Sequence, residues 1–180
     1  MTAPTLETKR LLLRHWKSED LPLFAKMNSD SQVMEYFPQK LTPEESDQLA
    51  KRIEQELEEK EFGLWAVEVK NKIPFIGFVG LHIQNFEAHF TPCIEIGWRL
   101  AHPYWRKGYA YEAATKVLSY AFETLKLEEI VAFTLPSNTP SRKLMEKLGM
   151  TYDPKDDFEN SKLPEGHPMR PHVLYRLKKC

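Results

Sequence analysis

The feature that most constrains this chain is the run of residues 93–125, which reads as a strand, a turn and a helix. The letters CIEIGWRL alternate as a strand does, with apolar side chains on one face and Glu95 and Gly97 on the other. Pro103 ends this pattern. From Ala110 onward the apolar residues recur three and four positions apart, which predicts one buried face of a long helix.

A basic turn with a glycine, WRKGYA at residues 105–110, separates the predicted strand from the helix. The first amides of a helix have no partner inside it, and the helix dipole places about half a positive charge there. Gly108 would let a phosphate approach the backbone, and Arg106 and Lys107 add charge. The turn therefore predicts a pyrophosphate site. The alternative is a solvated tight turn, since neither G-x-x-x-x-G-K-[ST] nor G-x-G-x-x-G is present.

The whole stretch resembles the GNAT N-acetyltransferases. In that family a turn of the form [QR]-x-x-G-x-[GA] holds the pyrophosphate of acetyl-coenzyme A (acetyl-CoA) through its amides. Here Trp105 stands at the usual Gln or Arg position, and this departure, together with Glu112-Ala113, is similar to the RimJ/RimL-type branch, which acetylates protein N-termini and related amines. The resemblance implies that the turn residues bind the coenzyme, namely Trp105, Arg106, Lys107, Gly108, Tyr109 and Ala110.

The rest of the chain alternates between strand and helix patterns in the order that this family shows. Helix starts are predicted at Ser18, at Thr42 with a capping box, and at Thr139 before a proline. Residues 154–171 are rich in proline and without periodicity, which predicts a loop of a length that is often functional. Strands are predicted over residues 8–16, 63–69, 75–83, 93–100, 129–135 and 173–177.

This order predicts an α/β (α+β) GNAT fold over a single domain of residues 1–180. The expected architecture is a mixed, mostly antiparallel sheet with helices on both faces and a V-shaped split between the fourth and fifth strands. In the family the pantetheine arm lies in that split like an added strand. The resemblance therefore implies that backbone groups of Trp98, Arg99 and Leu100 bind pantetheine, and that an amide near Leu100 polarises the thioester carbonyl.

Two further coenzyme contacts are implied by the family. An asparagine after the fifth strand and a serine three residues later contact pantetheine there, and the matching residues are Asn138 and Ser141. Without the resemblance, Asn138 would be interpreted as an ordinary loop or helix-cap residue.

Acetyl transfer also needs a base that deprotonates the amine, and Glu95 is the favoured candidate because it points away from the apolar face of its strand. The alternative for Glu95 is a solvated or ion-paired carboxylate. Glu112 is the next candidate, with support of the helix start as its alternative. Many GNATs place a tyrosine four residues after the serine to protonate the departing thiolate. Met145 stands there, which leaves Ser141 as the candidate donor, and a thiol pKa of about 8.5 makes that departure easy.

Composition narrows the classes of function. The chain has 25 basic and 26 acidic residues and a net charge of −1, which argues against a nucleic-acid partner. Cys93 and Cys180 are the only cysteines, too few for a disulfide framework, and they predict a reducing, cytoplasmic location. No signal peptide or membrane span is expected. No metal site is expected either, since His89 and Cys93 have no second pair of ligands.

Functions from different classes fit these observations. The first is an acetyl-CoA-dependent N-acetyltransferase, whose acceptor is either a protein N-terminal amine or a small-molecule amine. The alternative is a non-catalytic acyl-CoA-binding or partner-binding module, which would keep the turn without a working base. A third is a site for another phosphorylated ligand. Homodimers are common in the family, so a homodimer is also considered, although no interface is visible in the sequence.

Overall fold

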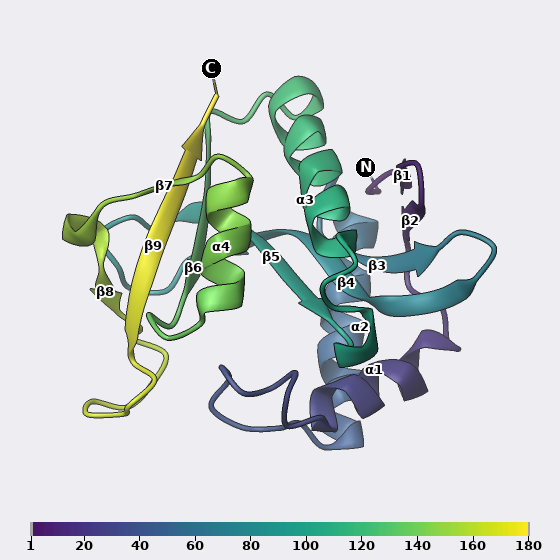
Figure 1. Ribbon diagram of the computed structural model, residues 1–180, viewed down its shortest axis with the longest axis horizontal. Helices are drawn as coiled ribbons and strands as arrows, with labels where there is room; N and C mark the ends of the chain where they lie inside the picture. The colour runs from purple at the N-terminus through teal and green to yellow at the C-terminus, as the bar shows by residue number, and fades with distance from the viewer. Residues whose placement is uncertain (1, 180) are drawn as a thin grey trace.

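The computed structural model describes residues 2–179 as a nine-stranded sheet with helices on both faces (Figure 1). The strands are β1 (Leu6–Glu7), β2 (Leu11–Arg14), β3 (Leu64–Val69), β4 (Ile73–Gln84), β5 (Cys93–Leu100), β6 (Glu129–Thr134), β7 (Thr151–Tyr152), β8 (Phe158–Glu159) and β9 (Pro171–Lys178). The helices are α1 (Asp20–Ser29), α2 (Pro43–Glu59), α3 (Tyr109–Ser119) and α4 (Thr139–Lys147), with short 3-10 segments at His102–Tyr104 and Pro154–Asp156 and a π-helical turn at Tyr120–Thr124. No helix among these residues is long and apolar enough to cross a membrane.

The strands follow the order β1-β2-β3-β4-β5-β6-β9-β7, and β8 pairs separately with β9. Every neighbouring pair is antiparallel except β5 and β6, which are parallel. Helices α3 and α4 lie on one face of the sheet, toward the viewer in Figure 1, and α2 lies behind it. The two faces are therefore separate environments, and β5 runs between them at the centre of the molecule.

The predicted split in the sheet is confirmed at the junction of β5 and β6. On one side, β5 pairs with β4 over its full length, from Gln84↔Cys93 to Gly77↔Leu100. On the other side, it pairs with β6 only at Glu95↔Val131. Beyond Glu95 the outer edge of β5 therefore has no strand partner, which is the V-shaped opening that the fold requires.

Of the three helix caps predicted at Thr42, Thr139 and Ser18, the structure confirms the one at Thr42. The capping box predicted at Thr42 is present, because its hydroxyl accepts from the Glu45 amide and the Glu45 carboxylate accepts from the Thr42 amide. The cap predicted at Thr139 is wrong by one residue, since the Asn138 side chain caps α4. The cap predicted at Ser18 is also wrong, because α1 begins at Asp20 with no side-chain cap.

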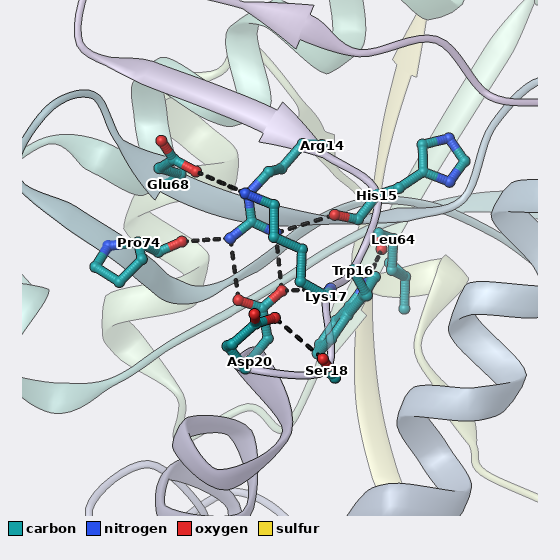
Figure 2. Close-up of polar contacts among 10 residues, drawn as sticks. Arg14, His15, Trp16, Lys17, Ser18, Asp20, Leu64, Glu68 and Pro74 are labelled. Atoms are coloured by element: carbon teal, nitrogen blue, oxygen red, sulfur yellow. Dashed lines mark hydrogen bonds and ion pairs between the residues drawn. The ribbon is translucent and has the colours of Figure 1, made fainter.

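The start of α1 is instead set by a buried ionic network (Figure 2). Arg14 on β2 donates two hydrogen bonds to the Asp20 carboxylate, at 2.8 and 3.0 Å, and one to Glu68 on β3, at 2.8 Å. Asp20 also accepts from the Lys17 amide at 2.9 Å. This network fastens the first turn of α1 to the sheet, which explains why Asp20 rather than Ser18 marks the helix start.

Two other elements differ from the prediction. The long helix expected to reach Leu125 widens after Ser119 into the π-helical turn, where Tyr120 packs edge-to-face on buried Trp65 and donates its hydroxyl to the Glu61 carbonyl. The stretch 154–171 is mostly loop, as predicted, but it also contains the short strand β8.

Candidate active site

The turn between β5 and α3 presents backbone amides that no side chain among residues 2–179 caps. Gly108, the N-cap of α3, has φ 78°, and Arg106 also has a positive φ, of 58°. A left-handed conformation at a residue other than glycine costs about 1 kcal/mol or more and persists only where the surroundings impose it. Here the Trp105 indole donates to the Leu100 carbonyl at 2.7 Å and ties the turn to the end of β5. The turn thus leaves the first amides of α3 free at the positive end of the helix, where an anion would be stabilised.

Arg10, which the sequence did not single out, lies against this turn. Its Nη1 donates to the Lys107 carbonyl at 3.0 Å, and its guanidinium lies 4.7 Å from the centre of the Tyr109 ring. A β-carbon built on Gly108 would come within 3.2 Å of its Nη2. Arg10 therefore places a third basic side chain at the turn, paired there with Glu112, from a segment about a hundred residues away in the chain.

Glu112 supports the turn and is not placed as a base. Its carboxylate accepts from the Thr8 hydroxyl at 2.6 Å, and from the Arg10 amide and Nε at 2.8 and 2.6 Å. Burial acts to raise the pKa of Glu112, but the hydrogen bonds from Thr8 and Arg10 outweigh it and the pKa is lowered. These contacts favour support of the helix start over a role as base, because Glu112 joins the β1–β2 turn to the start of α3.

The open edge of β5 exposes backbone groups of Trp98 and Leu100. The Ala101 amide donates to the Ile76 carbonyl on β4. Because successive residues of a strand point their polar groups to opposite edges, the groups of Arg99 face β4, where Arg99 pairs with Phe78. Those of Trp98, and the Leu100 amide, face the split. The Arg99 backbone is therefore directed away from the site expected for pantetheine.

Across the split, Asn138 and Ser141 lie at the start of α4. The Asn138 amide group is engaged, since its oxygen accepts from the Ser141 amide at 3.3 Å and its nitrogen donates to the Thr134 hydroxyl at 2.8 Å. The Ser141 hydroxyl, half-buried, has no hydrogen-bond partner among residues 2–179. Met145 is 2 % exposed and belongs to the core.

Glu95 lies on the opposite face of β5 from α3, partly buried. Its Oε2 accepts a hydrogen bond of 2.5 Å from the Gln84 amide, and the Gln84 oxygen in turn accepts from Lys162 at 2.9 Å. Burial raises the pKa of Glu95 to about 7, although the hydrogen bond from Gln84 and the charge of Lys162 oppose the rise. A carboxylate with a pKa near neutrality is suited to accept a proton from an amine at physiological pH.

Open space lies directly beside Glu95 on this face. Gly97 is the next residue on the same face, and a β-carbon built there would meet nothing within 4 Å. Further along the strand, Arg99 lines a cavity of about 570 Å³ bounded by the α1–α2 connection, by α2 and by Leu163 of the 154–171 loop. The face of β5 that carries Glu95 thus has open space at Gly97 and a cavity at Arg99.

Cys93 begins the same strand but is not a nucleophile. Burial, together with the nearby Glu95 charge, raises the pKa of the Cys93 thiol to about 11, so it stays protonated at neutral pH. Cys180, the other cysteine, lies outside the described residues. No cluster of three metal-ligating His, Cys, Asp or Glu side chains occurs within residues 2–179.

Comparison with known proteins decides the family. The family model described as an acetyltransferase (GNAT) domain matches residues 10–151. The chain belongs to the GNAT acetyltransferases. It has the RimJ/RimL-type sequence that the turn suggested, and it is an N-acetyltransferase.

Its relatives match over most of its length. The uncharacterized N-acetyltransferase YnaD of Bacillus subtilis is 32% identical over 96% of this chain and 95% of its own. The FsC-acetyl coenzyme A-N(2)-transacetylase of Aspergillus fumigatus is 30% identical over 83% of this chain and 66% of its own. Among solved structures, a GNAT-family acetyltransferase from Bacillus anthracis has a TM-score of 0.79, with 28% identity over 97% of this chain and 98% of its own.

Three residues of this GNAT site escaped the sequence analysis: Arg10, Gln84 and Lys162. Gln84 stands opposite Cys93 on β4 and β5, beside the pair of His82 and Glu95, but this register is visible only in the structure. Arg10 and Lys162 had no local signal, since each is brought to the site by a distant part of the chain.

Proposed function

We propose that this acetyltransferase moves an acetyl group from acetyl-CoA to a primary amine by direct attack within a ternary complex. The observation that carries the proposal is the layout of β5. One edge of this strand opens onto the split beside the uncapped start of α3, while Glu95, with its raised pKa, lies on the face turned away from α3. Donor and acceptor can therefore reach the strand from different sides and meet at it.

On the donor side, the pyrophosphate of acetyl-CoA would bind the turn, with Arg10 as an additional cation. Pantetheine would extend along the split, between the Trp98 and Leu100 backbone on β5 and the start of α4 at Asn138 and Ser141. The family uses acetyl-CoA, and the name of the Aspergillus relative includes the same donor. The residues proposed to bind the turn end of the coenzyme are Trp105, Arg106, Lys107, Gly108, Tyr109 and Ala110.

On the acceptor side, Glu95 would take a proton from the ammonium group, since the amine must be neutral to attack. The amine nitrogen then bonds to the thioester carbon, and the carbonyl oxygen gains negative charge that the Leu100 amide can stabilise. When the carbonyl re-forms, the carbon–sulfur bond breaks and coenzyme A leaves as a thiolate. The nitrogen loses its second proton to this thiolate or to solvent, which leaves a neutral amide and coenzyme A. Gln84 leaves the second oxygen of Glu95 available for the proton.

Ser141 is proposed to donate a hydrogen bond or proton to the departing thiolate. Its hydroxyl makes no hydrogen bond within residues 2–179, so it is available for this role. The contribution is expected to be small, because a thiol with a pKa of about 8.5 leaves readily at neutral pH.

The test is the pH dependence of kcat/KM, followed by thiol release from acetyl-CoA with a panel of amines and N-terminal peptides. Because Glu95 must be deprotonated, kcat/KM is expected to rise with pH and to level off above about 7. Glu95→Gln is expected to lower kcat/KM by a factor of about 10² to 10⁴ and to remove that inflection. Glu58→Gln, which removes an exposed carboxylate on α2, is the matched control and is expected to behave as the natural protein.

Two results would count against the proposal. Unchanged turnover and pH profile in Glu95→Gln would exclude Glu95 as the base. Tight binding of acetyl-CoA with no transfer to any amine would instead support the non-catalytic acyl-CoA-binding module.

A further inference from the structure

Arg99 is a largely covered cation with no acidic partner. No carboxylate within residues 2–179 forms a salt bridge with its guanidinium, and its Nε is buried without a hydrogen-bond partner. Burial alone lowers the pKa of Arg99 to about 10, so the group still carries its charge at neutral pH. A buried charge without a counter-ion is expensive in free energy, and proteins usually pair it.

The surroundings hold this guanidinium in one position. Its Nη1 donates to the Asn28 side chain at 2.8 Å, and Asn28, itself fully buried, donates to the Ser46 hydroxyl at 2.8 Å. The flat group lies 4.1 Å from the centre of the Phe37 ring and 5.4 Å from that of Phe78. Such an arrangement fixes the orientation of the cation without neutralising it.

The cavity that Arg99 lines has one acidic residue among residues 2–179, Glu45. The Glu45 carboxylate already accepts from the Thr42 amide in the capping box. Arg52 adds a second cation at the rim. The remaining lining is mostly apolar, and it includes Met34, Phe37, Leu41, Leu49 and Leu163. A volume of about 570 Å³ is in the range of small-molecule sites.

We propose that Arg99 binds a carboxylate of the acceptor, so that the acceptor is a small amino acid with an apolar side chain rather than a protein N-terminus. This inference rests on the proposed function and specifies its substrate class. Arg99 and Glu95 lie on one face of β5, with Gly97 between them. The proposed acceptor places its amine over the open space at Gly97, its carboxylate at Arg99, and its side chain in the apolar cavity.

The spacing along the strand is compatible with this placement. Residues two apart on one face of a strand are separated by about 7 Å. Gly97 is therefore about equally distant from the backbone of Glu95, which takes the proton, and from that of Arg99. The amine and the carboxylate of an amino acid are only a few bonds apart, so the proposed acceptor lies between Gly97 and the guanidinium that Asn28 and Phe37 hold. A peptide N-terminus has an amide in place of that carboxylate.

The test compares each free L-amino acid with its own amide, because the pair differs only in the charged group. Released thiol is measured for the natural protein, with acetyl-CoA saturating, and peptides with the same first residue are included. The free acid is expected to have a kcat/KM about ten- to a hundredfold above that of its amide, as charge-assisted hydrogen bonds usually give. This comparison needs no variant, so it does not depend on how a mutant folds.

Arg99→Met then links the preference to this side chain, since methionine keeps much of the packing between the two phenylalanines. The ratio of kcat/KM between the free acid and its amide is expected to fall to about one, because kcat/KM for the acid falls while that for the amide changes little. Lys51→Gln, which removes a positive charge from α2 outside the cavity, is the matched control and is expected to keep the natural ratio.

Calorimetric titration with acetyl-CoA separates the possible failures. The inference is overturned, while the proposed function stands, if amides or peptides are acetylated as efficiently as the free acids. It is also overturned if Arg99→Met keeps the natural ratio of kcat/KM between acid and amide. If acetyl-CoA binds but no amino acid in the full panel is acetylated, the inference is likewise overturned. If acetyl-CoA does not bind at all, the proposed function fails, and the inference fails with it.

Discussion

At the scale of single residues, Glu95 shows how far one side chain can be interpreted from sequence. The alternation in residues 93–100 correctly separated it from the apolar face of its strand. The pattern could not predict the pKa of Glu95, because the groups that surround the carboxylate, Gln84 and Lys162, come from another strand and from a distant loop. Burial raises the pKa of a carboxylate toward neutrality, which makes it useful as a base, but the same burial makes its charged form costly in the folded protein.

Because the buried charge of Glu95 is costly, Glu95→Gln is expected to stabilise the protein at alkaline pH. Burial raises the folded-state pKa of Glu95 to about 7, so the buried charge destabilises the folded state above that pH. The penalty disappears as the pH falls from 7 toward the ordinary value of 4.5, where the carboxyl is protonated in both states. At pH 8 the variant is expected to gain about 3 kcal/mol in free energy of unfolding.

Urea denaturation of the natural protein and of Glu95→Gln, at alkaline and acidic pH, measures this difference. The gain should shrink to near zero at the acidic end. A variant that is less stable than the natural protein at pH 8 would contradict the account of a desolvated carboxylate. Glu58→Gln, on the exposed side of α2, should show no such pH-dependent gain.

At the scale of elements, the structures that depend only on neighbours in sequence were predicted well. The strand, turn and helix of residues 93–119 and the capping box at Thr42 are local, and the structure contains them. The start of α1 was predicted wrongly because a tertiary interaction decides it. Ser18 carries the ordinary cap signal, but Asp20 is drawn into the pair with Arg14 and becomes the first helical residue.

Arg14→Met is therefore expected to destabilise the protein strongly. Asp20 is 2 % exposed and Arg14 6 %, so removal of the guanidinium leaves a buried carboxylate without its partner. The expected loss is about 3–5 kcal/mol in free energy of unfolding, measured by urea denaturation at neutral pH. Arg52→Met, at an exposed arginine of α2, is the control, with an expected change within about 0.5 kcal/mol. A loss below about 1 kcal/mol in Arg14→Met would show that the network does not anchor α1.

At the scale of the whole molecule, the proposed active site joins segments that no local pattern connects. Arg10 reaches the turn at Lys107, Asn28 holds Arg99, and Lys162 reaches across to Gln84. Each pair is separated by seventy or more residues, so its members meet only because the sheet brings their strands and loops together. The sequence could therefore predict the coenzyme turn and the strand that carries Glu95, but not the charges arranged around them.

The central claim is that the turn at Gly108 binds the pyrophosphate of acetyl-CoA. Calorimetric titration with acetyl-CoA, for the natural protein and for Gly108→Asp, tests it most directly. Aspartate is tolerated at positive φ better than most residues, so the turn itself should survive. Its carboxylate would occupy the anion site and pair with Arg10, whose Nη2 lies 3.2 Å from the new β-carbon.

Gly166→Asp is the matched control. It introduces the same residue at a glycine with a similar φ of 79°, in open space on the 154–171 loop. Binding by the natural protein and by Gly166→Asp, with a loss of at least about a hundredfold in Gly108→Asp, is the predicted result. Equal affinity in all three proteins would contradict the assignment of the turn, and no binding by the natural protein would contradict the whole account.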